Sequence, residues 1–258
     1  KERYESSPNE VERMNTEALR SNFLVENLFS KGKANFVYSH YDRMVMGGII
    51  PTTKAINLQN YDALKSKFFL ERREMGIISI GGKGTITADR KTYTLEKLSC
   101  LYLGRGIKKV SFKSSSKSKP AQFFLFSAPA HKEHPSTLYT EKEALPFELG
   151  SSQTSNHRTI YKYIHPAGIE SCQIVMGLTV LKDGSVWNTM PAHTHNRRSE
   201  VYCYFDVPKN HGVMHFMGQP QETRHLWVQN DQAIISPPWS IHAGSGTANC
   251  SFIWAMAG

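Results

Sequence analysis

Residues 191–205 read Pro191-Ala-His-Thr-His-Asn-Arg-Arg-Ser-Glu-Val-Tyr-Cys-Tyr-Phe205, and the rest of the chain can be arranged around them. His193 and His195 are separated by one residue, and residues two apart on an extended strand point to the same face. Glu200 follows five positions later, and the aromatic run after it favours a strand. The sequence therefore predicts a strand region that brings two imidazoles and a carboxylate close together.

A fourth candidate, His242, lies far downstream after Pro237 and Pro238. Three imidazoles and a carboxylate suit a divalent transition metal, and they leave room for water or substrate, as catalytic sites do. A lone His-x-His pair is common and is usually solvated, so the interpretation depends on its combination with the returning segment. We expect one divalent metal ion per chain, bound by His193, His195, Glu200 and His242.

The length and composition limit the class of protein. A chain of 258 residues forms one large domain or two of ordinary size, and 40% hydrophobic residues suffice for a buried core. No apolar run approaches the roughly 20 residues that span a bilayer, and residues 1–20 lack the apolar segment of a signal peptide. We expect a cytoplasmic protein with no membrane partner and four reduced cysteines: Cys100, Cys172, Cys203 and Cys250.

The formal net charge of +9 raises the question of nucleic-acid binding. The lysines are scattered, and the densest run, residues 108–119, contains three consecutive serines and is typical of a solvated loop. No nucleic-acid-binding motif accompanies the charge. We therefore expect no nucleic-acid partner, and interpret the positive charge as that of an enzyme with an anionic substrate.

Turn residues recur every 8 to 12 positions or so, which is the spacing of an all-β sandwich or barrel. A stretch rich in Pro, Ser, Thr and charge divides the strand-rich regions. We expect helices only over residues 9–22 and, briefly, 141–145. The expected division is an N-terminal arm (1–22), a first barrel without a metal site (23–126), a linker (127–158) and a second, metal-binding barrel (159–258).

The two halves of the chain resemble each other weakly. Arg72-Arg73 stands before one predicted strand much as Arg197-Arg198 stands before another. The first half has no histidine between His40 and His131, so it contains no counterpart of the metal ligands. Two barrels, of which one binds metal, explain these observations; the alternative is a chance similarity between two β-rich regions.

Seven segments spread over nearly the whole chain resemble the 5-keto-4-deoxyuronate isomerases, also called 4-deoxy-L-threo-5-hexosulose-uronate ketol-isomerases, within the cupin superfamily. They are Asn22-Phe-Leu-Val-Glu26, Val37-Tyr-Ser-His-Tyr-Asp-Arg43, Phe69-Leu-Glu-Arg-Arg-Glu74, Thr154-Ser-Asn156, Trp187-Asn-Thr-Met-Pro191, Met217-Gly-Gln-Pro-Gln-Glu-Thr-Arg-His225 and Ile235-Ser-Pro-Pro-Trp-Ser-Ile-His242.

The resemblance implies two jelly-roll cupin barrels, a homohexamer, and zinc in the second barrel. It implies the ligands His193, His195, Glu200 and His242, and all four match. The implied reaction converts 5-dehydro-4-deoxy-D-glucuronate to 3-deoxy-D-glycero-2,5-hexodiulosonate in the catabolism of pectin and other polyuronates. Such a ketol isomerisation needs removal of a proton alpha to the carbonyl, and a divalent metal can polarise that carbonyl.

The substrate is an anionic keto-deoxy sugar acid, whose carboxylate calls for a cation, preferably a guanidinium. Arg224 is the first candidate because it opens a predicted strand of the second barrel. Arg158 and Lys162 come second. Arg197 and Arg198, between the ligands, are as easily interpreted as solvated loop residues. The aromatic residues Trp187, Tyr202 and Tyr204 suit a sugar pocket, although isolated aromatics are more often core residues.

Glu200 is the leading candidate for the catalytic base, because a carboxylate that binds metal through one oxygen keeps the other oxygen free. His225, or Glu222, is a candidate to return the proton. Arg224 and His225 are neighbours on a predicted strand, so at most one of them faces the cavity. The sequence leaves open whether the hydrogen is transferred as a proton through a base, by way of an enediolate, or as a hydride directly between the carbons.

Two other function classes remain open at this stage. One is a cupin dioxygenase that uses iron, because three histidines and a glutamate also bind iron. The other is a non-enzymatic sugar-binding bicupin. Ligand type does not determine the metal either, so Mn²⁺ and Fe²⁺ stand beside Zn²⁺.

Overall fold

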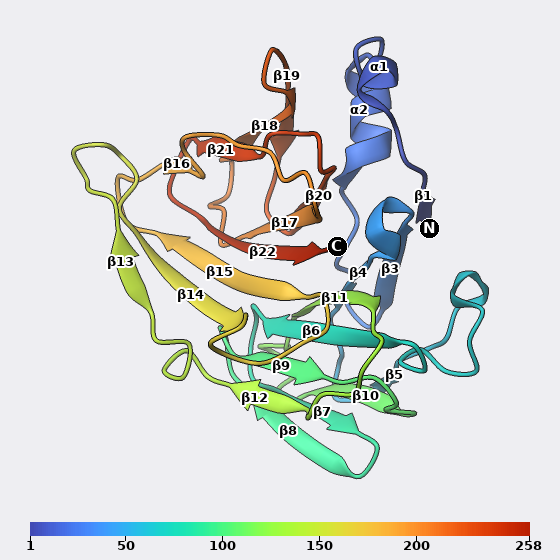
Figure 1. Cartoon of the computed structure of the whole chain (residues 1–258). Coiled ribbons are helices and arrows are strands. Elements are labelled where there is room, and N and C mark those ends of the chain that lie inside the picture. Colours follow the sequence, from blue (N-terminus) through green and yellow to red (C-terminus); the bar gives the residue numbers. More distant parts are fainter.

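A computed structural model describes all residues, 1–258, and its regular secondary structure is mostly strand, with a few short helices (Figure 1). The strands form four sheets, two of seven strands and two of four. The lower half of Figure 1 contains one large and one small sheet, and the upper half contains the other pair. The expectation of an all-β fold built as two β-barrels is confirmed.

The lower pair contains the strands of the first barrel. Its large sheet has the order β1 (Glu2–Arg3), β3 (Ala34–Ser39), β4 (Val45–Ile49), β11 (Phe123–Pro129), β6 (Arg73–Ser79), β9 (Cys100–Leu103) and β12 (Thr137–Tyr139). Its small sheet has the order β5 (Ile56–Asn57), β10 (Val110–Ser114), β7 (Gly84–Ala88) and β8 (Lys91–Leu95).

The upper pair contains the strands of the second barrel. Its large sheet has the order β13 (Phe147–Leu149), β14 (Arg158–Ile164), β15 (Val175–Leu181), β22 (Ser251–Ala257), β17 (Ser199–Phe205), β20 (Gln232–Ser236) and β2 (Leu24–Val25). Its small sheet has the order β16 (Trp187–Asn188), β21 (Ala243–Gly246), β18 (Val213–Gln219) and β19 (Glu222–Val228).

The central strands of the large sheets are buried on both faces, because the barrels pack against each other through them. On β11, Phe123 and Leu125 point into the core of the first barrel, whereas Phe124 and Phe126 belong to a second core that continues into the other barrel. Gly76 on β6 marks a close approach of the two barrels, since a Cβ there would lie 2.6 Å from the Sδ of Met176. The interface is therefore an extension of the hydrophobic core.

A buried carboxylate also joins the barrels. Glu74 on β6 is fully buried, and it accepts a hydrogen bond of 2.7 Å from the hydroxyl of Tyr102. It also accepts three bonds from backbone N–H groups of the second barrel, those of Cys172 (2.7 Å), Gln173 (2.7 Å) and Ile174 (3.0 Å). Buried charges persist where their bonding capacity is met in this way.

The N-terminal arm forms two helices instead of the single helix expected over residues 9–22. Helix α1 (Pro8–Val11) is capped by Ser7, and α2 (Thr16–Phe23) is capped by Asn15, whose side chain accepts the N–H of Ala18. The Asn15 cap starts a new helix and so divides the segment. Two 3₁₀ turns follow, η1 (Tyr41–Arg43) and η2 (Asp62–Leu64), while residues 141–145 form a hydrogen-bonded turn and not a helix.

The sheets cross the domain limits that were expected from the sequence. Strand β2 lies within the range expected for the first barrel (23–126) but pairs with β20 of the second barrel. Strands β12 and β13, inside the expected linker, extend the first and the second large sheet respectively. The division at residues 22, 126 and 158 therefore remains a proposal. Neither helix has the length and apolar character needed to cross a membrane.

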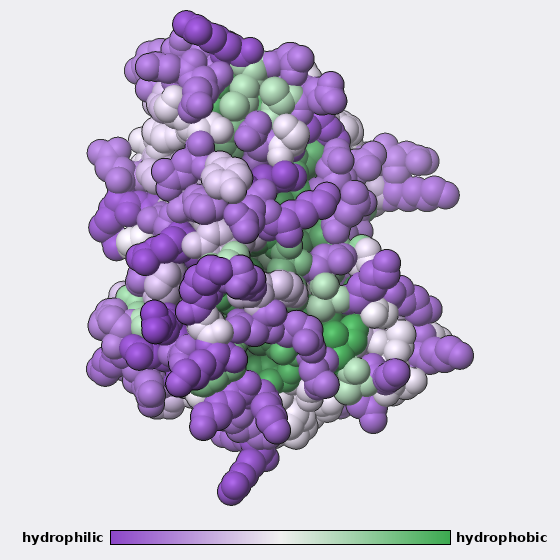
Figure 2. Space-filling model, turned by 90° about the vertical axis from the view of Figure 1, so that its right-hand side faces the viewer, coloured by the Kyte–Doolittle hydropathy of each residue, from purple (hydrophilic) through white to green (hydrophobic).

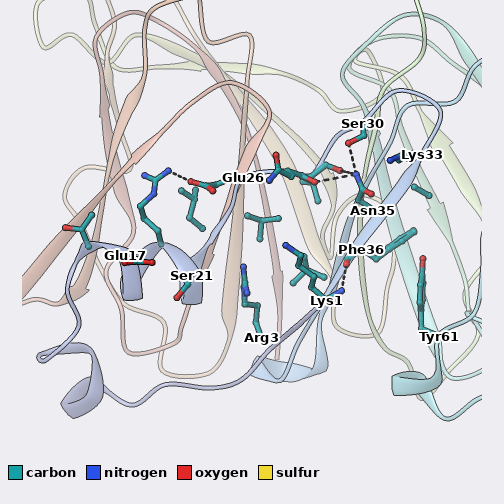
Figure 3. Close-up of a pocket in the computed structure, with 18 residues that line it drawn as sticks. Lys1, Arg3, Glu17, Ser21, Glu26, Ser30, Lys33, Asn35, Phe36 and Tyr61 are labelled. Carbon is teal, nitrogen blue, oxygen red and sulfur yellow. Dashed lines mark hydrogen bonds and ion pairs between the residues drawn. The ribbon is translucent and has the colours of Figure 1, made fainter.

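The face that carries the N-terminus, α2 and β3 is shown in Figure 2. Apolar residues, in green, are visible in a broken band down the middle of this face, between hydrophilic residues on both sides. A cavity of about 990 Å³ lies on this side between α2, β2 and β3, and Figure 3 shows it. Its wall includes Lys1, Arg3 and Lys33 as well as Glu17 and Glu26, so it has no single charge.

Candidate metal centre

The four expected ligands come from three places in the second barrel. His193 and His195 lie in the irregular segment between β16 and β17, Glu200 lies on β17, and His242 directly precedes β21. The expectation that His193 and His195 share a strand face is wrong, because the strand begins only at Ser199, after a turn at 196–197. The loop still turns both imidazoles towards His242.

The three imidazoles converge. Their ligating nitrogens all lie within 4.8 Å of one another. The Nε2 atoms of His193 and His195 are 2.9 Å apart, and the Oε2 of Glu200 lies 3.1 Å from the Nε2 of His242 and 3.9 Å from that of His195. Four donors bound to one ion with bonds of about 2.1 Å stand roughly 3.4 Å apart, so this cluster has the dimensions of a metal site.

Burial sets the electrostatics of the cluster. Desolvation lowers the pKa of His242 to about 3, with the neighbouring histidines adding to the effect. It lowers the pKa of His195 to about 4, with Arg198 and His193 adding to the effect. Burial raises the pKa of Glu200 to about 8, against a smaller opposing effect of Arg198. His195 and His242 are therefore neutral, the state in which imidazole binds metal.

The carboxylate of Glu200 receives no hydrogen bond from the imidazoles around it. The Oε2 of Glu200 is buried and has no hydrogen-bond partner, even though the Nε2 of His242 lies 3.1 Å away, because the geometry does not allow a hydrogen bond. A buried carboxylate oxygen without a partner is costly. A cation between Glu200 and the imidazoles would satisfy it.

The outer nitrogens of the imidazoles also have partners. The Nδ1 of His193 lies 3.4 Å from the carbonyl oxygen of Pro191, to which it can donate, so its Nε2 keeps a lone pair for a ligand. The Nδ1 of His195 instead accepts the Nε–H of Arg198 at 2.8 Å. The two histidines thus have opposite tautomers, and only His193 is already in the form that ligates through Nε2.

A cavity of about 670 Å³ lies over the cluster. Arg158 and Lys162 line it from β14, where they stand four residues apart on one face with Ile160 between them. The Arg198 side chain is the third cation in the wall, and Glu200 is the only carboxylate. The cavity therefore offers an anionic ligand three positive charges beside the candidate metal centre.

The structure places Arg224, the first candidate for the substrate carboxylate, outside this cavity. Its guanidinium bonds to the carbonyl oxygen of Glu12 at 3.0 Å and to the carboxylate of Glu222. Arg224 therefore holds the N-terminal arm, because α1 and α2 pack against the small sheet of the second barrel. His225, the candidate relay, is exposed on β19 and does not line the cavity either.

Some residues of the cavity wall had no signal in the sequence. The Thr189 hydroxyl bonds that of Tyr202 at 2.8 Å, and the indole N–H of Trp254 donates to the hydroxyl of Thr179 at 3.2 Å. Tyr202 does line the cavity as expected. Tyr204 is a core residue that bonds His215, and Trp187 stacks on Phe216 away from the cavity.

Comparison with known sequences gives a consistent result. The model of the KduI/IolB family matches residues 23–258. A protein of Halalkalibacterium halodurans named 4-deoxy-L-threo-5-hexosulose-uronate ketol-isomerase is 56% identical over 99% of this chain and 93% of its own length. Its counterpart of the same name in Shouchella clausii is 55% identical with the same coverage.

Comparison with solved structures shows the fold. An IolB-like protein from Salmonella typhimurium superposes with a TM-score of 0.73 over 92% of this chain and 93% of its own, at 14% identity. An oxalate decarboxylase of Bacillus subtilis superposes with a TM-score of 0.63 over 91% of this chain and 76% of its own, at 12% identity. Because the identities are so low, these two likenesses support the architecture alone.

Proposed function

The chain belongs to the KduI/IolB family and is a ketol-isomerase, and we propose that it works with one divalent metal ion bound by His193, His195, Glu200 and His242. The proposed reaction converts 5-dehydro-4-deoxy-D-glucuronate to 3-deoxy-D-glycero-2,5-hexodiulosonate. The observation that supports the metal most directly is the unpartnered, buried Oε2 of Glu200, 3.1 Å from the Nε2 of His242.

We propose zinc as the ion, since three imidazoles and a carboxylate are ligands that Zn²⁺ accepts, although Mn²⁺ and Fe²⁺ accept them too. When bound, a divalent ion polarises a carbonyl group and acidifies the proton on the adjacent carbon. Residues of the cavity wall bind the substrate carboxylate and transfer the proton.

Three cations of the cavity wall are candidates for binding the substrate carboxylate. Arg158 and Lys162 project from one face of β14, and Arg198 approaches from the loop before β17. Arg158 has already one hydrogen bond, to the carbonyl oxygen of Asn156 at 2.9 Å, which fixes its guanidinium at the cavity wall. We propose that Arg158 binds the carboxylate and that Lys162 and Arg198 complement its charge.

Proton transfer has one carboxylate available. Glu200 is the only acidic residue in the wall, and neither Glu222 nor His225 reaches the cavity. We propose that Glu200 removes the proton alpha to the carbonyl and returns it to the neighbouring carbon on the same side of the substrate. Because a single base on one side removes and returns the proton, we expect part of the substrate's own hydrogen to appear in the product.

The assembly and location are proposals of the same kind. A homohexamer follows from the resemblance to the isomerases, and the apolar band of Figure 2 is a surface that association would cover. The four cysteines are all free, which favours the reducing cytoplasm. Mass photometry of the purified chain tests the hexamer directly.

The experiment that tests the function combines metal analysis with an assay. Protein stripped with a chelator is reloaded with Zn²⁺, Mn²⁺ or Fe²⁺. Conversion of 5-dehydro-4-deoxy-D-glucuronate is then followed by NMR. We expect one equivalent of metal to restore the isomerisation. Full turnover by stripped protein that contains less than a tenth of an equivalent would contradict metal dependence.

A further inference from the structure

A second group of cations lies in the first barrel. Two adjoining clefts, of about 340 and 240 Å³, share Arg43, Arg72 and Pro129 in their walls. One also includes Arg105, and the other includes Arg73. No acidic residue lines either cleft, and neither shares a residue with the cavity over the metal centre.

Arg73 is the most unusual member of this group. Its side chain is buried, with 6% of the residue exposed, and no carboxylate pairs with it. Its Nε donates to the hydroxyl of Ser127 at 3.1 Å, and its Nη2 donates to the carbonyl oxygens of Arg43 (2.7 Å) and Ser127 (2.8 Å). Burial lowers the pKa of Arg73 to about 10. The Nη1 group makes no hydrogen bond within the protein.

The other arginines also lack a counter-charge. The guanidinium groups of Arg43 and Arg72 are exposed and make no ion pair or hydrogen bond. Arg105 donates only to backbone carbonyl oxygens, those of Glu71 (3.1 Å), Ala130 (3.3 Å) and His131 (3.2 Å). The four guanidinium groups of Arg43, Arg72, Arg73 and Arg105 therefore line the same pair of clefts with only neutral groups as hydrogen-bond partners.

The nearest carboxylates in sequence are engaged elsewhere. Glu74, next to Arg73, lies on the opposite face of β6 and accepts its four bonds from Tyr102 and the second barrel. Glu71 accepts the backbone N–H of Lys67 at 2.7 Å. A buried guanidinium without an anion is costly, and exposed guanidinium groups beside it add repulsion.

We propose that these clefts bind a small oxyanion, the carboxylate of a sugar acid or a phosphate group, through Arg43, Arg72 and Arg73. Guanidinium groups recognise both oxyanions through paired N–H bonds. The Nη1 of Arg73 supplies an unpartnered donor from a largely buried side chain, and Arg43 and Arg72 supply the charge at the rim. The anion restores the charge balance that the protein itself does not supply.

The arginines of the clefts come from two separate parts of the chain. Arg43 ends the segment Val37–Arg43, and Arg72 and Arg73 belong to Phe69–Glu74. Neither segment contributes a residue to the cavity of the metal centre. The fold brings the two segments together at the clefts, where the Nη2 of Arg73 bonds to the carbonyl oxygen of Arg43.

Calorimetric titration of the metal-loaded chain, residues 1–258, tests this site. The probes are inorganic phosphate and D-glucuronate, in separate titrations at constant ionic strength. The wild-type protein should bind at least one of them in the clefts, and the stronger of the two identifies the oxyanion. In Arg72→Gln and in Arg43→Gln we expect affinity for that probe to fall about 10-fold or more, as for the loss of a charge-assisted contact.

Two control variants separate this site from others. Arg90→Gln removes an exposed arginine that lies outside both clefts and should leave the affinity unchanged. His195→Ala disrupts the metal centre and should leave binding in the clefts intact. Unchanged affinity in both cleft variants, loss of all binding in His195→Ala, or no binding of either probe at 10 mM would each overturn the proposal, and none of these results depends on isomerase activity.

Discussion

The Nε–H of Arg198 donates to the Nδ1 of His195 across 2.8 Å, and this bond determines which ring nitrogen carries the proton. A neutral imidazole that accepts at Nδ1 has its proton on Nε2, the nitrogen that faces His193 and Glu200. Ligation through the Nε2 of His195 therefore requires the proton to move to Nδ1 and Arg198 to turn away. The guanidinium released in this way is free to bind a substrate carboxylate.

This relationship makes Arg198→Gln informative. Without the competing donor, affinity for Zn²⁺ should stay equal or rise, whereas KM for the anionic substrate should rise roughly 10-fold or more because a charged contact is lost. Competition with a fluorescent chelator measures the first quantity, and steady-state kinetics the second. If zinc affinity instead fell in parallel with activity, Arg198 would be a support for the metal centre and not a substrate contact.

His195→Ala should abolish stoichiometric metal binding and leave the chain folded, because the side chain lies in a loop and not in a strand. Elemental analysis after gel filtration and circular dichroism provide the two measurements. His211→Ala is the matched control, since His211 is an exposed loop histidine that bonds Thr247 and does not line the cavity of the metal centre. Retention of a full equivalent of metal in His195→Ala would remove it from the ligand set.

Glu200→Gln should lower kcat by roughly 10²–10⁴-fold, the usual cost of losing a general base. The assay needs saturating zinc, so that weaker metal binding by the amide does not account for the loss. Substrate carrying deuterium on the carbon that is deprotonated should deliver only part of its label to the product in ordinary water. Complete retention of that label at every stage would indicate a hydride shift and leave Glu200 as a ligand only.

His225→Ala should keep most of the wild-type kcat, because the side chain is exposed on β19 outside the cavity. The same kinetic assay applies to it. A loss comparable to that of Glu200→Gln would restore the relay role expected from the sequence.

Glu74→Gln should destabilise the chain by about 3 kcal/mol or more. The carboxylate accepts four hydrogen bonds in a buried site, and an amide would present donors to some of the same N–H groups. Urea denaturation gives the free energy of unfolding. Glu96→Gln, which breaks only the exposed pair with Lys83, should cost less than about 1 kcal/mol. Equal losses in the two variants would contradict the role of Glu74 in joining the barrels.

His215 predicts a pH dependence of stability. Burial lowers its pKa to about 3 in the folded chain, whereas an unfolded histidine titrates near about 6.5. Between these values the unfolded state binds the extra proton, so the stabilising contribution is present above pH ~6.5 and is lost as the pH falls. In His215→Gln the fall in unfolding free energy below pH ~6 should be smaller by up to about 1.4 kcal/mol per pH unit; an unchanged slope would exclude this residue.

The candidate metal ligands are the part of the site that the sequence predicts best. Imidazole and carboxylate groups are metal ligands by residue type alone, so the sequence is enough to identify His193, His195 and His242 as candidate ligands. Their local structure was less predictable. Residues two apart share a face in a strand, but a loop brings His193 and His195 together without that periodicity.

The cations of the cavity could not be ranked from the sequence. Arg158 and Lys162 face the cavity because of the register of β14 with β15, which depends on pairing with distant residues. Arg224 was chosen because it opens a strand, but that strand is at the edge of the small sheet, where the N-terminal arm takes up its guanidinium. Strand β2 is equally hidden, since two residues carry no periodic pattern.

The pairing of β2 with β20 has a consequence for the newly made chain. Leu24 and Val25 leave the ribosome about 210 residues before Ile234 and Ala233, the residues they pair with. At the usual rates of translation this delay lasts roughly 10–40 s. During that time the first barrel can form beside a tethered, unpaired N-terminal segment. Closure of the second large sheet therefore waits for the late synthesis of β20, and until then Leu24 and Val25 remain unpaired and accessible to chaperones and proteases.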